Sequence, residues 1–332
     1  MMPASIKQAL KRQVSSDAVW RAMSRWFPRT AVVLAYHRIG PPDAPFRKVT
    51  IDNFRAQMAW LRRHCAVLRP TELRRAVEHP PDRLPVLVTF DDGYRDYYEH
   101  AAPILREFSI PAVNFVATQF VDDGSLFWWD LIDLACQRAP AGDVSLPWRG
   151  EPYPVRTAAD RMRVYRECQR HLKTVADAEK QRLLPPVFDA LAFDPAGVRM
   201  ARQVMTWDQM RETSDITTYG GHLHSHPLVS RIDAVQLDAE LQLSARRMEA
   251  ELGSRPTLFA YPDGDITPGA KAALREHGYD LAFGILEGVV TKSSDWLAID
   301  RLTGPATVAD LAWRIARLHR PLRGRRPSPL PV

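Results

Sequence analysis

The amino-acid sequence predicts a parallel α/β protein, built either as a barrel or as a doubly wound sheet. Short apolar runs alternate with longer segments of helical periodicity through most of the chain. Such alternation is typical of strand–helix–strand units, in which the strands are parallel and helices cover them. The chain has 332 residues, 45% of them hydrophobic and 25% charged, which is the composition of a globular protein.

The expected strands and helices follow one another in order. Each strand candidate is a short, mostly apolar run, and each helix candidate repeats apolar residues at intervals of three or four. The strands are expected at 31–36, 85–90, 112–117, 216–221, 257–261 and 279–283, and the helices at 52–64, 71–78, 94–108, 233–252 and 268–277.

A stretch from about 122 to 205 interrupts this rhythm and is predicted to be a helical insertion between two core strands. Its helices are expected at 127–138, 158–174 and 177–191, with a Pro/Gly-rich break at 139–154. The insertion lies inside a main domain that we place at 31–304.

The two ends of the chain are predicted to lie outside this domain. Residues 1–30 are basic, and the pattern over 5–27 predicts an amphipathic helix that either packs on the domain or lies on a membrane surface. Residues 305–332 are expected to form a helix followed by a basic, Pro-rich tail.

Charge and cysteine content exclude several classes of protein. The net charge is only +6, so the sequence gives no reason to expect a nucleic-acid partner. Three cysteines exclude a disulfide framework and a zinc site made of cysteines alone. No run reaches the ~20 apolar residues of a membrane span, and no secretion signal is recognisable. We therefore expect a cytoplasmic location, with peripheral membrane contact through the N-terminus as one alternative.

Two carboxylates stand directly after an apolar run, in the segment Thr89-Phe90-Asp91-Asp92-Gly93. Adjacent side chains point in different directions, so one carboxylate can bind a metal while the other acts as a base. The alternative is structural, with Asp92 capping the following helix and Asp91 beside it.

Three histidines follow another apolar run, in Gly220-Gly221-His222-Leu223-His224-Ser225-His226. Imidazoles together with one carboxylate suit Zn²⁺ or another first-row divalent ion, with positions left open for water and substrate. Co²⁺, Ni²⁺ and Mn²⁺ are the alternatives to Zn²⁺.

These two motifs, in this order, resemble those of the polysaccharide deacetylase (NodB homology) family of carbohydrate esterases. The resemblance runs from about Val32 to Leu302 and is loose over 122–205. It implies a distorted (β/α)7 barrel in which Asp92, His222 and His226 hold the metal and Asp91 is the base.

The general acid is implied by a second resemblance, to the branch of the family that carries its catalytic histidine near the N-terminus. The segment Leu34-Ala35-Tyr36-His37-Arg38-Ile39 matches that version, which makes His37 the acid. We expect His37 on the substrate side, across the metal from Asp91.

The remaining site residues are less closely matched to the family. Asp263 stands where a tyrosine is usual, and its backbone N–H is the candidate for stabilising an oxyanion. Leu223 replaces a hydroxyl residue. Arg301 is expected either to keep Asp91 ionised or to form a surface ion pair. The candidate substrate-binding residues are aromatic: Tyr94, Trp128 and Tyr261.

The resemblance implies a metal-dependent hydrolase of carbon–nitrogen bonds other than peptides, which removes N-acetyl groups from a sugar, with O-acetyl groups as the alternative. The expected partner is an acetylated amino-sugar glycan or a lipid-linked sugar. Two alternatives remain: an inactive sugar-binding relative, and a different metallohydrolase that pairs His222 with His224.

Overall fold

The computed structural model describes the chain except for residues 1–3, 26, 28, 43–45, 47 and 320–332. The strands are β1 Val32–Tyr36, β2 Ile39–Gly40, β3 Val49–Thr50, β4 Cys65–Val67, β5 Leu84–Phe90, β6 Ala112–Val116, β7 Gly142–Val144, β8 Tyr153–Val155, β9 Thr217–Gly221, β10 Leu258–Ala260, β11 Leu281–Phe283 and β12 Leu302–Thr303. The α-helices are α1 Ala4–Val14, α2 Asp17–Ser24, α3 Ile51–His64, α4 Leu73–Glu78, α5 Ala102–Glu107, α6 Thr118–Asp123, α7 Trp128–Arg138, α8 Ala158–Leu172, α9 Asp177–Ala190, α10 Trp207–Thr213, α11 Ala234–Leu252, α12 Pro268–Glu276 and α13 Val308–Leu318.

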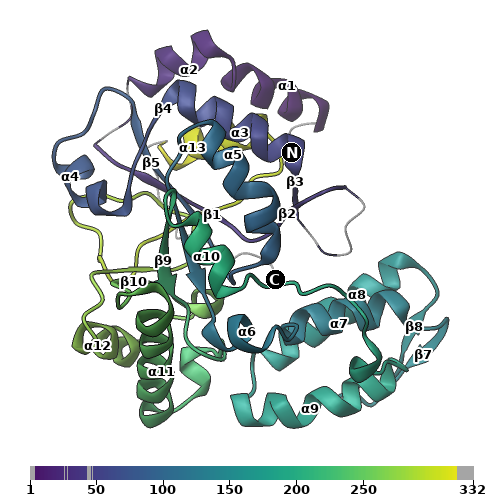
Figure 1. Ribbon diagram of the computed structural model, residues 1–332. Helices are drawn as coiled ribbons and strands as arrows, with labels where there is room; N and C mark the ends of the chain where they lie inside the picture. Colours follow the sequence, from purple (N-terminus) through teal and green to yellow (C-terminus); the bar gives the residue numbers. More distant parts are fainter. Residues whose placement is uncertain (1–3, 26, 28, 43–45, 47, 320–332) are drawn as a thin grey trace.

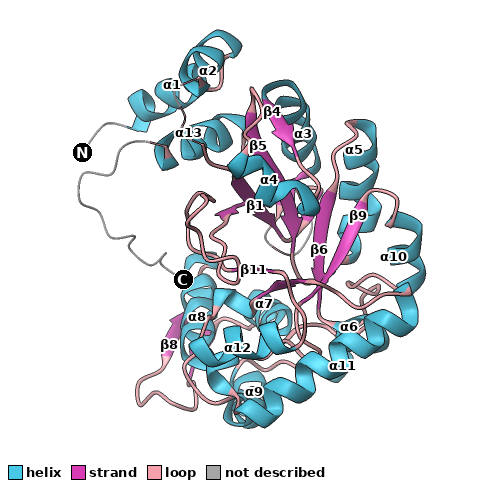
Figure 2. Cartoon of the chain, turned by 90° about the vertical axis from the view of Figure 1, so that its left-hand side faces the viewer, coloured by secondary structure: helices cyan, strands magenta, loops and turns pink. Residues whose placement is uncertain are grey.

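Eight strands form one parallel sheet that curls into a distorted barrel (Figures 1 and 2). Seven of them run in the order β11-β10-β9-β6-β5-β1-β12, and β4 pairs with β5. The segment before β12 bridges the two edges, because Ile299 pairs with Phe283 of β11 while Leu302 pairs with Leu34 of β1. The predicted α/β fold is confirmed, with every predicted core strand present.

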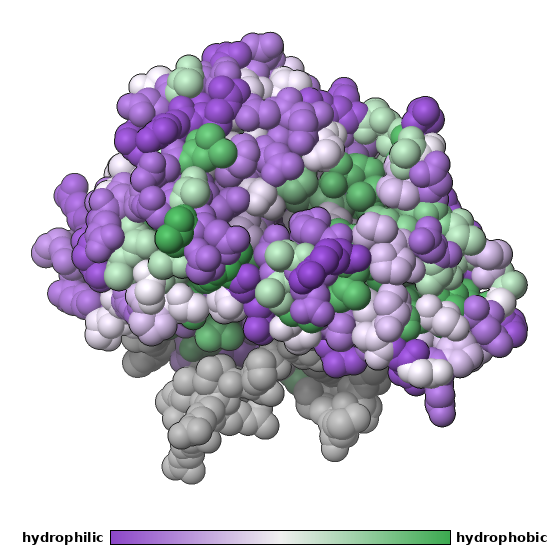
Figure 3. Space-filling view, turned by 90° about the horizontal axis from the view of Figure 1, so that it is seen from below, coloured by the Kyte–Doolittle hydropathy of each residue, from purple (hydrophilic) through white to green (hydrophobic). Residues whose placement is uncertain are grey.

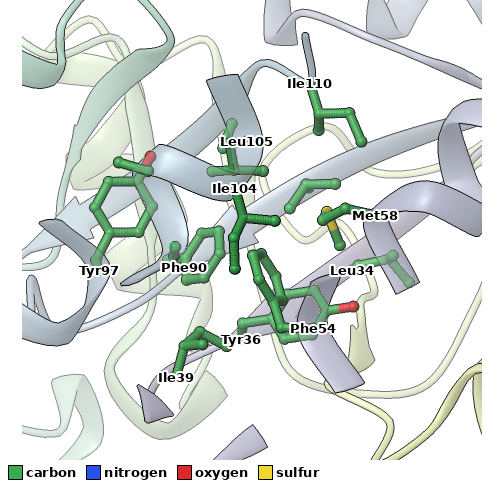
Figure 4. Close-up of a cluster of buried hydrophobic side chains, with 14 of the residues drawn as sticks. Leu34, Tyr36, Ile39, Phe54, Met58, Phe90, Tyr97, Ile104, Leu105 and Ile110 are labelled. Carbon is green, nitrogen blue, oxygen red and sulfur yellow. The ribbon is translucent and has the colours of Figure 1, made fainter. Parts of the chain in front are cut away.

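The strands are apolar on both faces because both faces are covered. On β1, Leu34 and Tyr36 point toward the outer helices and join Phe54 of α3 and Phe90 of β5 in the cluster that Figure 4 shows. The alternate residue, Val33, belongs to a second cluster that fills the barrel with residues such as Phe115 and Phe283. This alternation is the period of two that a strand imposes on its side chains.

The insertion between β6 and β9 has a hydrophobic core of its own, built from α7, α8, α9 and the β7–β8 hairpin. Figure 1 shows these elements grouped to one side of the barrel. Its three predicted helices are confirmed. The predicted irregular break at 139–154 contains a short antiparallel hairpin, in which Gly142–Val144 pairs with Tyr153–Val155.

The N-terminal segment forms two helices where the sequence predicted one over 5–27. The break falls after α1, where the hydroxyls of Ser15 and Ser16 donate to the carbonyls of Arg12 and Gln13 and so compete with helix hydrogen bonds. In α2, Trp20 is fully buried against Trp60 of α3, with ring centroids 4.5 Å apart. The largest apolar side chain of α2 is therefore packed against the barrel and is not exposed on the surface.

Two further predictions concern helices and the tail. The helix predicted at 94–108 contains a π-helical segment, Tyr97–Ala101, before α5. Beyond α13, the predicted Pro-rich tail lies outside the described residues. None of the helices described in the structure is long and apolar enough to span a membrane.

Candidate metal and active site

Three strands bring the candidate catalytic residues to one end of the barrel. His37 follows β1, Asp91 and Asp92 follow β5, and His222 and His226 follow β9. Since the strands are parallel, their carboxyl ends meet at the same end, where the active sites of α/β barrels form. All five side chains line one cavity of about 230 Å³.

Asp92, His222 and His226 are arranged as a set of metal ligands. The two Nε2 atoms are 3.1 Å apart, and Oδ1 of Asp92 lies 3.5 Å from Nε2 of His222 and 3.4 Å from Nε2 of His226. Ligands bound at about 2.0–2.1 Å to a tetrahedral cation are separated by about 3.3 Å. These distances and the N/N/O donor set therefore fit Zn²⁺ or a similar ion. No other such group occurs among the residues that the structure describes.

The orientation of His222 is fixed by the next strand. Its Nδ1 donates to the carbonyl of Ala260, at 2.7 Å, so Nε2 carries the lone pair that faces the other ligands. The preceding glycines allow this close packing. A Cβ on Gly220 would lie 2.5 Å from the ring of Phe115, and one on Gly221 would also meet a neighbouring side chain.

The loop that carries the histidines is held by Glu240 of α11. Its carboxylate accepts from the backbone N–H groups of His224 and Ser225, at 2.7 and 2.8 Å, and from the Ser225 hydroxyl at 2.6 Å. These bonds support two left-handed residues, Leu223 with φ 65° and His226 with φ 60°. Strained backbone of this kind persists where its surroundings hold it.

Arg301 resolves one alternative left open by the sequence, because it is a buried partner of Asp91. It is 1% exposed and donates to both carboxylate oxygens, at 2.8 and 2.7 Å. It also donates to the carbonyl of Gly284 and to the hydroxyl of Thr89. Burial alone would raise the pKa of Asp91, but the Arg301 charge and hydrogen bonds hold that pKa below its usual value.

His37 lies in the cavity with its side chain 40% exposed, but not where we expected it. Its Nε2 is 3.8 Å from Oδ2 of Asp91, so it stands beside the base and not across the metal from it. The reason is strand order: β1 and β5 are neighbours, and Tyr36 pairs with Phe90. The residues that follow these two are therefore side by side.

The three candidate substrate-binding aromatics fall into different places. Trp128 lines the cavity at the start of α7. Tyr261 also lines it, although its hydroxyl donates to the carbonyl of Leu297. The prediction for Tyr94 is wrong, because this ring does not line the cavity. It is 2% exposed, and its hydroxyl accepts from the indole N–H of Trp129.

Asp263 lines the cavity, but its carboxylate faces the insertion instead of the metal ligands. It accepts from Nζ of Lys173, at 2.7 Å, where Lys173 directly follows α8. Asp263 has a left-handed backbone with φ 55°. His224 also stays out of the ligand set, since its Nδ1 bonds the hydroxyl of Thr118 at 2.8 Å. A metal centre built on His222 and His224 is therefore not what the fold brings together.

Most of the cavity wall that the insertion provides could not be predicted from the sequence. The side chains on one face of α8 recur at helical spacing, but no motif marks them. The lining residues from the insertion that were not predicted are Trp129, Tyr165, Gln169, Leu172, Lys173, Val175, Asp177 and Lys180.

The family model for polysaccharide deacetylase matches residues 78–184 and 193–282, which together make up more than half of the chain. The chain belongs to the polysaccharide deacetylase family. The match includes both the Asp91–Asp92 motif and the histidine loop.

The match to two curated relatives covers 40% of the length of one and 15% of the length of the other. Bacillus subtilis (strain 168) YxkH is 31% identical over 113 residues, which are 33% of this chain and 40% of the relative. The poly-beta-1,6-N-acetyl-D-glucosamine N-deacetylase of Escherichia coli (strain K12) is 31% identical over 103 residues, 29% of this chain and 15% of the relative. The chain thus spans well under half of either protein.

Two solved structures confirm the fold. The Streptococcus pyogenes deacetylase PplD has a TM-score of 0.58 at 17% identity, over 89% of this chain and 100% of PplD. IcaB from Ammonifex degensii has a TM-score of 0.56 at 20% identity, over 87% of this chain and 97% of IcaB.

The two departures from the family pattern leave the ligand set of this polysaccharide deacetylase intact. Leu223 is fully buried in a hydrophobic cluster beside α11, and Glu240 supplies hydrogen bonds to the loop. Asp263 is paired with Lys173. Neither side chain stands between the metal ligands.

Proposed function

We propose that this protein is a metal-dependent hydrolase that removes N-acetyl groups from the sugar units of a glycan, with O-acetyl groups as the alternative. The observation that carries the proposal is the ligand set Asp92, His222 and His226, which opens onto the same cavity as Asp91 and His37. An acetamide is a poor electrophile, so its hydrolysis requires both an activated water and a proton for the leaving amine.

A divalent cation held by these three residues would supply a Lewis acid that lowers the pKa of water and polarises a carbonyl. The residues of the chain would do the rest. Asp91, kept ionised by Arg301, would accept a proton from the attacking water. The backbone N–H of Asp263 is the candidate donor to the oxyanion that forms on the acetyl group.

His37 is the candidate acid for the departing amine. Its side chain is 40% exposed in the cavity, so it can approach a bound substrate, whereas the Asp91 carboxylate is only 4% exposed. An amide nitrogen cannot leave as an anion, so its protonation is required for turnover.

The test is release of acetate from N-acetylglucosamine oligomers by the metal-loaded protein. Asp91→Asn should keep its metal content, and its kcat should fall roughly 10²–10⁴-fold, which is the usual contribution of a positioned proton-transfer group. Oligomer binding without any acetate release by the metal-loaded protein would support instead the inactive sugar-binding relative. A lipid-linked substrate, contact with a membrane and a cytoplasmic location stay predictions.

A further inference from the structure

The wall of the cavity opposite the barrel is formed by one face of α8. Tyr165, Gln169 and Leu172 recur along this helix at intervals of four and three residues, Lys173 follows its end four residues after Gln169, and all of them line the cavity. Residues so spaced share one side of a helix. Val164, Cys168 and Leu172 repeat at intervals of four and belong to the insertion's own core, so the cavity face of α8 borders this buried face and Leu172 belongs to both.

Gln169 is the unusual member of this face. It is 7% exposed, and its amide nitrogen is buried without a hydrogen-bond partner. A buried N–H donor that lacks a partner destabilises the folded protein, because it has lost its hydrogen bonds to water. Because this donor lies in the wall of the cavity, a bound ligand could provide the acceptor that it lacks.

The side-chain amide is free to turn toward such a ligand. The last torsion of a glutamine is soft, and rotating it breaks no hydrogen bond of the nitrogen, since none is present. The helix itself is fixed in place: one turn further along, Lys173 pairs with Asp263 of the barrel loop after β10. The unpaired donor is thus carried by a helix that is fixed to the barrel.

The surrounding wall has the composition of a sugar-binding surface. Trp128 and Tyr165 supply aromatic rings, and Lys180 is buried with its ammonium 5.7 Å from the centre of the Trp128 ring and paired with Asp177. Binding sites combine apolar and aromatic surface with a few placed polar groups, and here the polar groups are an amide and two ion pairs. They match a neutral ligand that is rich in hydroxyl and carbonyl oxygens. Figure 3 shows the outer surface from below, where hydrophobic residues gather on the right-hand part and the left-hand part is mostly hydrophilic.

We propose that Gln169 is a specificity-determining residue that donates to an oxygen of the sugar part of the substrate, so that the insertion selects acetylated glycans over simple acetyl esters. The proposal rests on the proposed function for its substrate class. It assigns the chemistry to the barrel and the recognition of the sugar to α8.

The test compares two substrates in the metal-loaded protein: a β-1,6-linked N-acetylglucosamine tetramer and an aryl acetate, which has no sugar. In Gln169→Leu, the ratio of kcat/KM for the tetramer to kcat/KM for the aryl acetate should fall about tenfold, the value of one lost hydrogen bond to the substrate. Gln181→Leu, on α9 and outside this cavity, is the matched control and should leave the ratio unchanged.

Two further measurements separate this proposal from a structural role and from the proposed function. Because the buried nitrogen has no partner, Gln169→Leu should not lower the thermal midpoint. Tetramer affinity, measured by tryptophan fluorescence, should weaken about tenfold in Gln169→Leu even if no acetate is released, in which case only the proposed function fails. An unchanged affinity, or an equal loss on both substrates, would overturn the role of Gln169.

Discussion

Replacing Arg301 by methionine should destabilise the protein by about 3–5 kcal/mol, because it leaves the Asp91 carboxylate buried without a cation. Asp91 is 3% exposed, and Arg301 supplies the two short hydrogen bonds that its oxygens accept from a side chain. The carbonyl of Gly284 loses a donor as well. The measurement is urea unfolding of the metal-free protein, since a bound metal would stabilise the folded state by mass action.

The Asp91→Asn background makes the test specific. An asparagine does not need a buried cation, so the double variant should be about 2–3 kcal/mol more stable than the sum of the two single losses predicts. Arg106→Met is the matched control, because Arg106 also binds both oxygens of its partner, Asp215, but at the surface. Exposed pairs contribute about 0–1 kcal/mol. If Arg301→Met loses no more stability than Arg106→Met, the buried-pair reasoning is refuted.

Three more predictions concern the metal and the acid. His226→Ala should lose most of its bound metal while His224→Ala retains it, since His224 is bonded to Thr118, and metal content measured by elemental analysis decides between them. Glu240→Gln should weaken metal affinity roughly 10–100-fold, because it disturbs the hydrogen bonds that hold the ligand loop, and competition with a chelator measures this. His37→Ala should lower kcat strongly on an acetamide but only slightly on an aryl acetate, because the alcohol of the ester departs without a proton. Equal losses in kcat on the two substrates would show that His37 is not the acid.

The catalytic end of the barrel could be predicted because its residues are local in the sequence. Asp91 and Asp92 follow their strand directly, and the histidine loop follows another, so an apolar run with polar residues after it is enough to place them. Parallel strands then bring such residues to one edge without any knowledge of distances.

The arrangement of residues within that edge could not be predicted in the same way. No single segment of the sequence determines the order of the strands in the sheet. The pairing of β1 with β5 places His37 beside Asp91. Arg301 lies 210 residues from Asp91 in the chain, so the sequence showed a basic residue near a strand end but not its partner. Tyr94 directly follows the motif, yet it faces into the protein and not into the cavity.

The insertion was predicted as helices, but its contribution to the site was not. Helical periodicity identifies the buried face of α8, and it gives the same pattern whether the other face meets solvent or a cavity. Gln169 is therefore indistinguishable from a surface glutamine in the sequence. Only the barrel opposite α8 shows that this face is enclosed.

In the proposed function, the barrel carries the chemistry and the insertion recognises the substrate. The metal ligands and the base are oriented by Ala260, Glu240 and Arg301, all of which belong to the barrel. The insertion folds around its own core, and it joins the barrel near the site through pairs such as Lys173 with Asp263. The insertion also touches a ligand directly, since the centre of the Trp129 ring of α7 lies 4.6 Å from that of His226. We therefore expect substitutions on the cavity face of α8, which contributes no metal ligand, to change the substrate preference while the metal content stays unchanged.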